Sequence, residues 1–177
     1  MRLLGGSAYD PCSLIHIRSD LKTTMHTNIQ FREATSADLP ALVQLLADDE
    51  LGAQREDTSH PLNTRYREAF EQIAADPNNE LIVIHEGDEL VGTLQLTFTP
   101  YLTHTGTWRC TVEGVRIASR YRGAGMGNRL LRWAIQRAEQ RGCNLVQLTS
   151  DKRRKDAIRF YESLGFHATH EGFKLAI

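Results

Sequence analysis

The residues from Arg122 to Asn128 have the composition of a loop that binds phosphate. Glycine stands at positions 123, 125 and 127, and glycines at alternating positions leave the backbone N–H groups uncovered. An alternating apolar run that ends at Ile117 precedes the loop, and a helical pattern follows from Leu130. The first turn of a helix has N–H donors without intrahelical acceptors, and such a turn attracts phosphate. The pattern predicts a strand, a phosphate-binding glycine loop and a helix.

Two familiar glycine loops do not fit this stretch. The dinucleotide-binding fingerprint, started at Gly123, requires glycine where Asn128 stands. The Walker loop requires lysine and then serine or threonine after its last glycine, but Asn128 and Arg129 follow Gly127. Neither site is predicted. A glycine turn without a ligand is the alternative that the loop alone leaves open.

Two segments together resemble the GNAT superfamily of acetyl-CoA-dependent N-acetyltransferases. Arg122-x-x-Gly125-x-Gly127 is similar to the family's pyrophosphate-binding signature, Gln/Arg-x-x-Gly-x-Gly/Ala. Residues 157–166 resemble its C-terminal signature, and the two segments stand in the family's order. The resemblance covers roughly residues 28 to 177. It implies an acyltransferase that moves the acetyl group of its cosubstrate, acetyl-CoA, to an amine.

The resemblance also assigns residues to acetyl-CoA. The pantetheine arm would lie between two central strands that splay apart, with backbone hydrogen bonds from Val115 and Ile117. A backbone group of Val115 would also polarise the thioester carbonyl. Arg122 is the charged residue of the signature, and a solvent-facing loop arginine is its alternative reading. The pyrophosphate would be held by backbone N–H groups of Arg122, Gly123, Ala124, Gly125, Met126, Gly127 and Asn128.

Acetyl transfer to an amine requires two proton movements. An ammonium with a pKa of about 10 must lose a proton before it attacks, and the departing thiolate gains one. Tyr161 coincides with the tyrosine of the C-terminal signature and is the predicted acid. Burial in the core is the alternative for this side chain, because Tyr161 shares an apolar helix face. Glu113, just upstream of Val115, is the predicted base, and a carboxylate paired with an arginine is its alternative.

One position departs from the family's pattern. Many members carry asparagine three residues before the alanine of the last signature, where this chain has Arg154. The contact between that asparagine and the cofactor therefore does not carry over. Arg154 or a neighbouring basic residue could reach a phosphate instead.

Charge is unevenly distributed along the chain. Residues 109–159 contain 13 Lys/Arg against 4 Asp/Glu, whereas the rest contains 8 against 18. A basic half around a glycine loop suits a polyanion such as CoA. The acidic stretch from Asp48 to Pro61 is expected to form a loop over the acceptor site, where it could attract an amine. Solvated surface positions are the alternative for any single charge.

Composition limits the class of protein. A chain of 177 residues, 41% hydrophobic and 24% charged, fits one soluble domain. No stretch approaches the ~20 apolar residues that span a bilayer, so we expect no membrane contact and a cytoplasmic location. Cys12, Cys110 and Cys143 lack the spacing of disulfides or zinc sites. The seven histidines also lack ligand spacing, so we expect no metal.

The predicted elements follow the order β-α-α-β-β-β-α-β-α-β, a mixed α/β (α+β) sheet with helices on both faces. This is also the order of the GNAT fold, with its central splayed strands. Residues 1–27 are expected to be an N-terminal extension, disordered or not native, and residues 28–177 the N-acetyltransferase domain. A helix capped by Thr35 or Ser36 is expected to bury a stripe of Leu39, Leu42, Val43, Leu45 and Leu46. Strands are expected over residues 28–34, 81–85, 90–98, 108–117, 144–149 and 166–175, with further helices ending at Asp76, Arg141 and Gly165.

We therefore predict a cytoplasmic N-acetyltransferase that acts by direct attack in a ternary complex. No cysteine stands where a covalent acetyl carrier is indicated. The acceptor is expected to be the primary amine of a small molecule or peptide, and a homodimer is compatible with the resemblance. The rival hypothesis is a non-catalytic acyl-CoA-binding regulatory or nucleic-acid-binding module that uses Lys152–Lys155. The acidic remainder and the lack of interleaved aromatic residues argue against nucleic acid.

Overall fold

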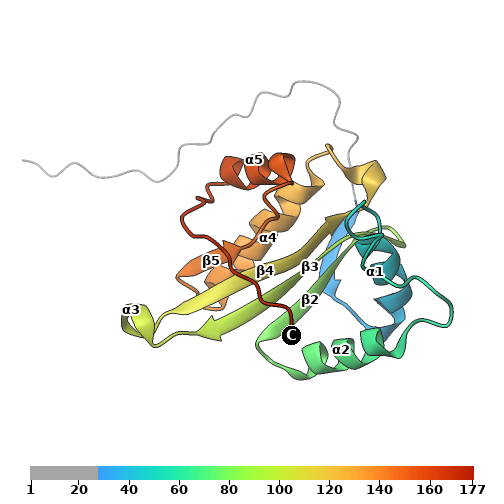
Figure 1. The fold of residues 1–177 in the computed structure, drawn as a ribbon, viewed down its shortest axis with the longest axis horizontal. Helices are drawn as coiled ribbons and strands as arrows, with labels where there is room; N and C mark the ends of the chain where they lie inside the picture. Colours follow the sequence, from blue (N-terminus) through green and yellow to red (C-terminus); the bar gives the residue numbers. More distant parts are fainter. Residues whose placement is uncertain (1–27) are drawn as a thin grey trace, which may run out of the picture.

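The computed structural model describes residues 28–177, and the expected extension over residues 1–27 lies outside this range. A five-stranded sheet of order β1-β2-β3-β4-β5 forms the centre of the domain (Figure 1). The first four strands are antiparallel neighbours, and β5 runs parallel to β4. The strands are β1 (Ile29–Glu33), β2 (Asn79–Glu86), β3 (Glu89–Pro100), β4 (Trp108–Ile117) and β5 (Leu145–Leu148).

The helices appear where the sequence predicts them, with two short additions, α3 and η2. A short turn, α3, joins β3 to β4 and was not expected. Gly142, with φ +72°, follows the last residues of α4 as predicted. The helical elements are η1 (Ser36–Asp38), α1 (Leu39–Leu46), α2 (Thr64–Ala75), α3 (Thr103–Gly106), η2 (Ser119–Tyr121), α4 (Met126–Gln140) and α5 (Lys155–Ser163).

Of the two predicted caps, Thr35 begins the first helical segment. Its backbone N–H and hydroxyl both donate to the Asp38 carboxylate, at 2.7 and 2.9 Å. Arg32 adds a two-pronged contact of 2.8 Å to each carboxylate oxygen. These bonds, led by the one from Arg32, hold the pKa of Asp38 well below its usual range. The charge is nearly buried and paired at the junction of β1 and α1.

The two faces of the sheet have separate cores. Ile82 and Ile84 on β2 belong to the core that contains the buried face of α4. Val83, between them, is equally buried and faces the other side because side chains alternate along a strand. Helix α1 contacts β3 and β4, and α2 contacts β2. The mixed α/β class, with helices on both faces, is therefore confirmed.

Helix α5 packs against α4 at a glycine of the predicted loop. A Cβ added to Gly127 would lie 3.3 Å from the ring of Phe160, closer than an ordinary van der Waals contact. Phe160, Tyr161 and Leu164 all pack against the core on this face. Gly127 therefore permits the close approach of the two helices, a role that the sequence did not predict.

Strands β4 and β5 pair over only part of their length. Their register runs from Arg109 opposite Leu145 to Val112 opposite Leu148, where β5 ends. Strand β4 continues to Ile117 and bends at Gly114, where its register with β3 shifts between Thr93 and Gln95. The second half of β4 therefore has no β5 neighbour. This is the splayed arrangement that the resemblance implies.

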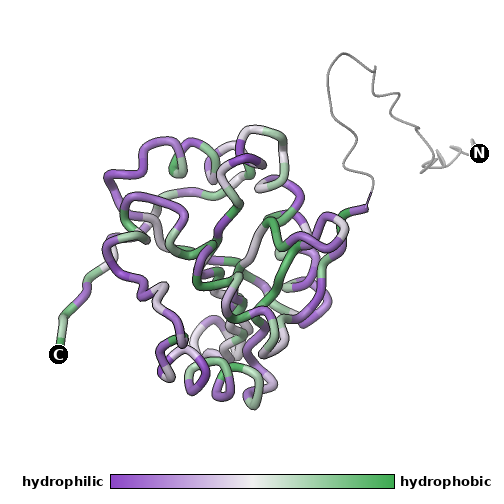
Figure 2. Tube along the Cα trace, turned by 90° about the vertical axis from the view of Figure 1, so that its right-hand side faces the viewer, coloured by the Kyte–Doolittle hydropathy of each residue, from purple (hydrophilic) through white to green (hydrophobic). Residues whose placement is uncertain are grey.

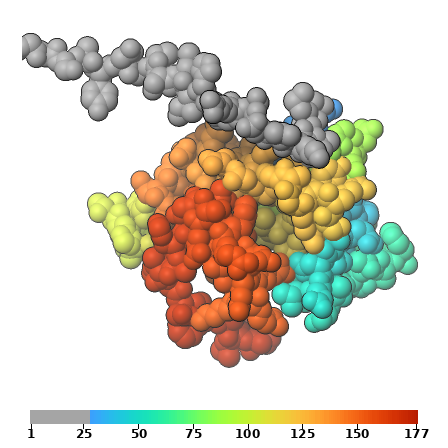
Figure 3. Space-filling view, turned by 90° about the horizontal axis from the view of Figure 1, so that it is seen from above, coloured from blue at the N-terminus to red at the C-terminus, as the bar shows by residue number. Residues whose placement is uncertain are grey.

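The strand predicted over residues 166–175 does not form, which makes this element of the prediction wrong. The segment has no regular structure, and Phe173, Leu175 and Ile177 are almost fully exposed. Its end points away from the body of the domain in Figure 2, and Figure 3 shows an open gap beside it. Polar residues at its start, including His167 and His170, interrupt the alternation. A strand also needs a paired edge, and β5 offers only four residues.

Candidate active site

The glycine loop presents free N–H groups, as predicted. Among residues 28–177, no group accepts a hydrogen bond from the backbone N–H of residues 123–128. Gly123 and Gly125 adopt φ values of +78° and +80°, which side chains other than glycine rarely adopt. No atom lies within 4 Å of where their Cβ atoms would be. The loop is an open cradle at the first turn of α4, and its donors suit a diphosphate.

Arg122 differs from the prediction in one respect. Its backbone N–H is not free, because it donates to Ser119 at 3.2 Å. Its side chain donates from Nε to the Ile117 carbonyl at 2.9 Å and from Nη2 to the Asp48 carbonyl at 2.6 Å. Figure 3 shows the loop after β4 beside the residues near position 50. Arg122 therefore fastens the end of β4 to the loop that follows α1.

Three of the predicted cofactor residues share one cavity of about 650 Å³, whereas the loop residues 123–128 are not part of its wall. Val115, Ile117 and Arg122 all line it. The carbonyl of Val115 accepts a hydrogen bond of 2.9 Å from the side chain of Arg116, and a carbonyl oxygen has a second lone pair for a ligand. Six cationic side chains and two acidic ones line the same cavity: Arg116, Arg122, Arg153, Arg154, Lys155 and Arg159, against Asp49 and Asp156.

Tyr161 lies beside this cavity, although it is not part of its wall. Its ring packs against those of Phe160 and Phe166, at centroid distances of 5.3 and 6.0 Å. Burial raises the pKa of its phenol, and the positive charges of Arg154 and Arg116 oppose that shift. The ring thus packs against the core, as the alternative interpretation held. The hydroxyl stays protonated near neutral pH and interacts electrostatically with both arginines.

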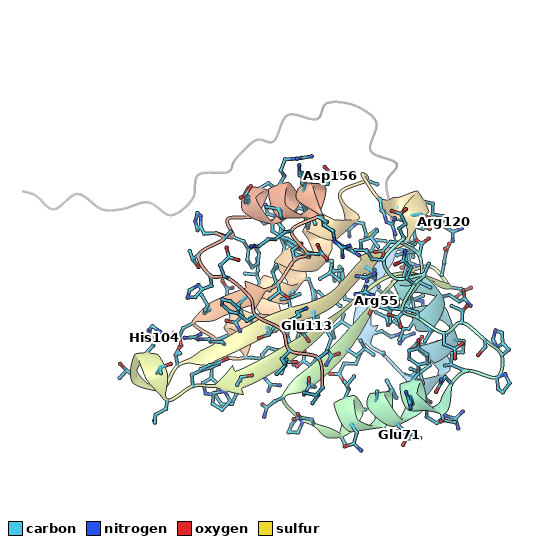
Figure 4. The ribbon with its side chains drawn as sticks, viewed as in Figure 1. Arg55, Glu71, His104, Glu113, Arg120 and Asp156 are labelled. Carbon is cyan, nitrogen blue, oxygen red and sulfur yellow. The ribbon has the colours of Figure 1, made fainter. Side chains whose placement is uncertain are left out.

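Glu113 lies apart from the other predicted residues. Its side chain is exposed, does not line the cavity, and lies over the middle of β4 in Figure 4, away from Arg120 and Asp156. Within the described residues no ion pair or hydrogen bond involves its carboxylate, so the alternative, a carboxylate paired with an arginine, is not what the structure shows. The carboxylate of Glu113 is therefore open to solvent and stands outside the cavity wall.

A cluster of charges that sequence reasoning missed lies at the centre of the cavity. Arg116 and Arg154 approach the same oxygen of Asp49, Oδ2, at 3.5 and 2.8 Å. The other oxygen, Oδ1, accepts the N–H of Gly52 at 2.7 Å. Burial opposes ionisation of Asp49, but these partners hold its pKa below the ordinary value. The sequence signal was available, since Arg116 lies between two predicted cofactor residues.

Asp48 and Asp49 therefore do not act as free carboxylates that attract an amine. Asp48 accepts from the Ser119 N–H at 2.7 Å and pairs with Arg122 at 3.1 Å. Asp49 is occupied by its two arginines. Asp49 lines the cavity, so these two charges of the acidic loop bind the protein's own cations, and the position of the loop relative to an acceptor stays a prediction.

Both described cysteines are poor nucleophiles. Burial raises the pKa of Cys110 to about 12 and also raises that of Cys143. A thiol must ionise to attack a thioester, so neither suits a covalent acetyl carrier. Cys12 lies outside the described residues.

The fold, the splayed strands and the free loop amides together define an acyl-CoA-dependent acetyltransferase of the GNAT type. The sequence profile of the Acetyltransferase (GNAT) family matches residues 40–166, and the chain belongs to this family. It is an N-acetyltransferase, as its curated relatives are.

Two related enzymes and one related crystal structure show which proteins this chain is similar to. An aminoalkylphosphonate N-acetyltransferase from Salmonella typhimurium is 28% identical over 151 residues, 84% of this chain and 91% of that protein. A glucosamine 6-phosphate N-acetyltransferase from Trypanosoma brucei brucei is 33% identical over 86 residues, 49% of this chain and 56% of that protein. A crystal structure described as a transcriptional regulator from Bacillus halodurans C-125 is 56% identical, with a TM-score of 0.82, covering 85% of this chain and all of that one.

Two further findings concern the described residues alone. No group of three or more His, Cys, Asp or Glu side chains within residues 28–177 is arranged to hold a metal ion. In the same range no helix is long and apolar enough to cross a membrane.

Proposed function

We propose that this protein transfers the acetyl group of acetyl-CoA to the primary amine of a small molecule or peptide by direct attack in a ternary complex. One observation carries the proposal. The uncommitted N–H groups of residues 123–128 follow the half of β4 that has no β5 neighbour. A diphosphate held by this loop would direct the pantetheine arm along β4 toward Val115.

The proposed roles follow from the positions of the side chains. A backbone group of Val115 polarises the thioester carbonyl. Tyr161 donates its phenolic proton to the sulfur as the C–S bond breaks, and its raised pKa keeps that proton available. Glu113 accepts the proton that the acceptor ammonium must lose, through water because its carboxylate lies outside the cavity wall.

Direct transfer is supported by the cysteines. Cys110 is fully buried, and the raised pKa of both Cys110 and Cys143 keeps them as thiols. Two free thiols are also consistent with the reduced, cytoplasmic setting that we propose.

The names of the curated relatives support an amine that carries a negative charge. One acts on aminoalkylphosphonates and the other on glucosamine 6-phosphate. These substrates have little in common besides a primary amine and an anionic phosphorus group. We propose an acceptor of the same chemical type for this protein.

The direct test is thiol release from acetyl-CoA in the presence of a panel of amines. We expect initial rates that give intersecting lines when both substrates are varied, as a ternary complex requires. Parallel lines, or an acetylated protein isolated without acceptor, would contradict direct attack. In Glu113→Gln we expect turnover to fall and the ionisation of the base to disappear from its pH profile.

A second candidate function is regulation through nucleic acid. It is favoured by one observation, the description of the 56% identical structure as a transcriptional regulator. Several arginines of the basic cavity are already paired: Arg122 with Asp48, Arg153 with Asp151, and Arg159 with Asp156. These pairings weaken the case for a phosphate-backbone surface. Binding to duplex DNA that weakens steeply with salt, without thiol release from any amine, would favour this alternative.

A further inference from the structure

Arg116 lines the same cavity as Val115 and Ile117, but its side chain leaves β4 on the opposite face of the strand. Val115 and Ile117, on either side of it, pack against the core that contains α4. Because side chains alternate along a strand, Arg116 faces the opposite side, toward the loop that follows α1. The free amides of residues 123–128 belong to the loop before α4 and to its first turn, and so lie on the α4 side. A ligand on Arg116 would approach the thioester from across β4.

The Arg116 side chain is largely buried, although it lacks some of the hydrogen bonds that a buried guanidinium needs. Only 12% of it is exposed, and its Nε lies 3.5 Å from Asp49 Oδ2, which forms an ion pair but leaves Nε without a hydrogen-bond partner within the described residues. Burial lowers the pKa of its guanidinium, although Asp49 counteracts this. An orphaned buried donor costs free energy. This cost is offset if a bound molecule accepts the hydrogen bond that the Arg116 guanidinium lacks.

Asp49 is too small a counterion for the arginines around it. Arg116 and Arg154 share its Oδ2, so two cations meet one anion. The charges that act on Arg116 also include those of Arg55 and Glu56, and Glu56 already accepts a hydrogen bond of 2.9 Å from the Tyr66 hydroxyl. Figure 4 shows Arg55 beside α1. The cluster therefore has a surplus of positive charge and unused N–H donors.

We infer that Arg116 and Arg154 form a subsite for a phosphate or phosphonate group on the acceptor amine, and that Asp49 holds the two guanidinium groups in place. This inference rests on the proposed acetyltransferase function and assigns the residues that select its substrate. Two guanidinium groups from different elements meet at one point, which suits a tetrahedral group with three oxygens better than a planar carboxylate. Because Tyr161 interacts electrostatically with both arginines, an acceptor bound to them lies close to the proposed general acid.

The first experiment compares matched acceptors with the wild-type protein. The probes are 2-aminoethylphosphonate, β-alanine and ethylamine, which differ chiefly in the group at the far end from the amine. We expect a KM for 2-aminoethylphosphonate at least about tenfold lower than for the other two, the discrimination expected from one charge-assisted hydrogen bond. Glucosamine 6-phosphate against glucosamine repeats the comparison with a phosphate. Equal KM values, or a preference for β-alanine, would overturn the inference.

Variants then test which residues cause the preference for the phosphonate. Arg154→Gln and Arg116→Gln should raise the KM for 2-aminoethylphosphonate roughly 10- to 100-fold, a larger increase than for the KM of ethylamine or of acetyl-CoA. Arg154→Lys should recover part of the loss. The control is Arg67→Gln, which removes a positive charge from the exposed surface of α2 and should leave every KM unchanged. An increase in the KM for acetyl-CoA instead would assign the cluster to the cofactor and overturn the inference.

A binding measurement separates this inference from the proposed function. Calorimetry with 2-aminoethylphosphonate on the CoA-saturated protein needs no turnover. If no amine is acetylated, yet the phosphonate binds and Arg154→Gln weakens binding about tenfold or more, the proposed function fails and the subsite stands. If amines are acetylated but the phosphonate binds no better than ethylamine, the subsite fails and the function stands.

Discussion

Gly125 is the residue on which the phosphate-binding loop most depends. It precedes α4 as the N-cap, with φ +80° and ψ 0°, and its missing Cβ would point into open space. Gly125→Ala therefore adds backbone strain without a steric clash. A residue with a side chain pays roughly 1–2 kcal/mol in the left-handed region. Alanine also lowers the conformational entropy of the unfolded chain, which stabilises the folded state by about 0.4–1 kcal/mol. We expect a net loss of about 1 kcal/mol in the free energy of unfolding.

The same substitution should reduce the free energy of CoA binding by more than it reduces the free energy of unfolding. The chain relieves the strain by rotating the peptide groups of residues 124–126, which turns N–H donors away from the diphosphate. A hydrogen bond to a charged group contributes about 1.5–3 kcal/mol, so the loss of one raises the Kd for CoA roughly 10- to 100-fold. Calorimetric titration with CoA measures this without an acceptor.

Gly142→Ala is the matched control. Gly142 has φ +72° and equally open space around its Cβ position, and it follows the opposite end of the same helix. We expect the same loss of about 1 kcal/mol, a decrease in Tm of roughly 3 °C, and an unchanged Kd for CoA. If Gly125→Ala and Gly142→Ala bind CoA equally well, the amides of the loop do not hold the diphosphate, and the reasoning fails.

Three further outcomes are expected. Tyr161→Phe should lower kcat about 100-fold with little loss of stability, since its hydroxyl makes no hydrogen bond to residues 28–177; undiminished turnover would exclude Tyr161 as the acid. Asp38→Asn should destabilise the fold by about 2 kcal/mol in urea unfolding. In the wild type the folded pKa of Asp38 is lowered, so its contribution is present above the ordinary value of 3.8 and lost as pH falls below it; the variant should lack this acid dependence. Serine at Phe173, Leu175 and Ile177 should each change the unfolding free energy by no more than about 0.5 kcal/mol, because these side chains are exposed.

The parts of the fold that the sequence predicts well are those governed by local patterns. Strand β4 has the predicted bounds, Trp108–Ile117, because the alternation of buried residues is regular up to Gly114. The hairpin before it turns at Gly87, with φ +59°, as its composition indicates. Thr35 begins the first helical segment because Asp38, three residues later, completes the capping box.

The parts that the sequence does not predict depend on contacts between distant segments. The expected last strand fails although Phe173, Leu175 and Ile177 alternate, because alternation cannot show whether a neighbouring edge is available to pair. The packing role of Gly127 depends on Phe160 in another helix. The salt bridge from Arg154 to Asp49 joins residues 105 positions apart. No local pattern predicts such pairs.

Arg154 shows how a departure from a family pattern can become informative once the fold is known. In the sequence it stands where relatives in the family often have asparagine, and the inference was that the cofactor contact does not carry over and that Arg154 could reach a phosphate instead. In the structure its guanidinium reaches Asp49 across the cavity, on the side of β4 that Arg116 faces. On the proposed subsite, a substitution that removes a contact to the cofactor adds a charge beside the acceptor. Since both arginines meet at one carboxylate oxygen, a larger anion at that point would satisfy donors that Asp49 cannot.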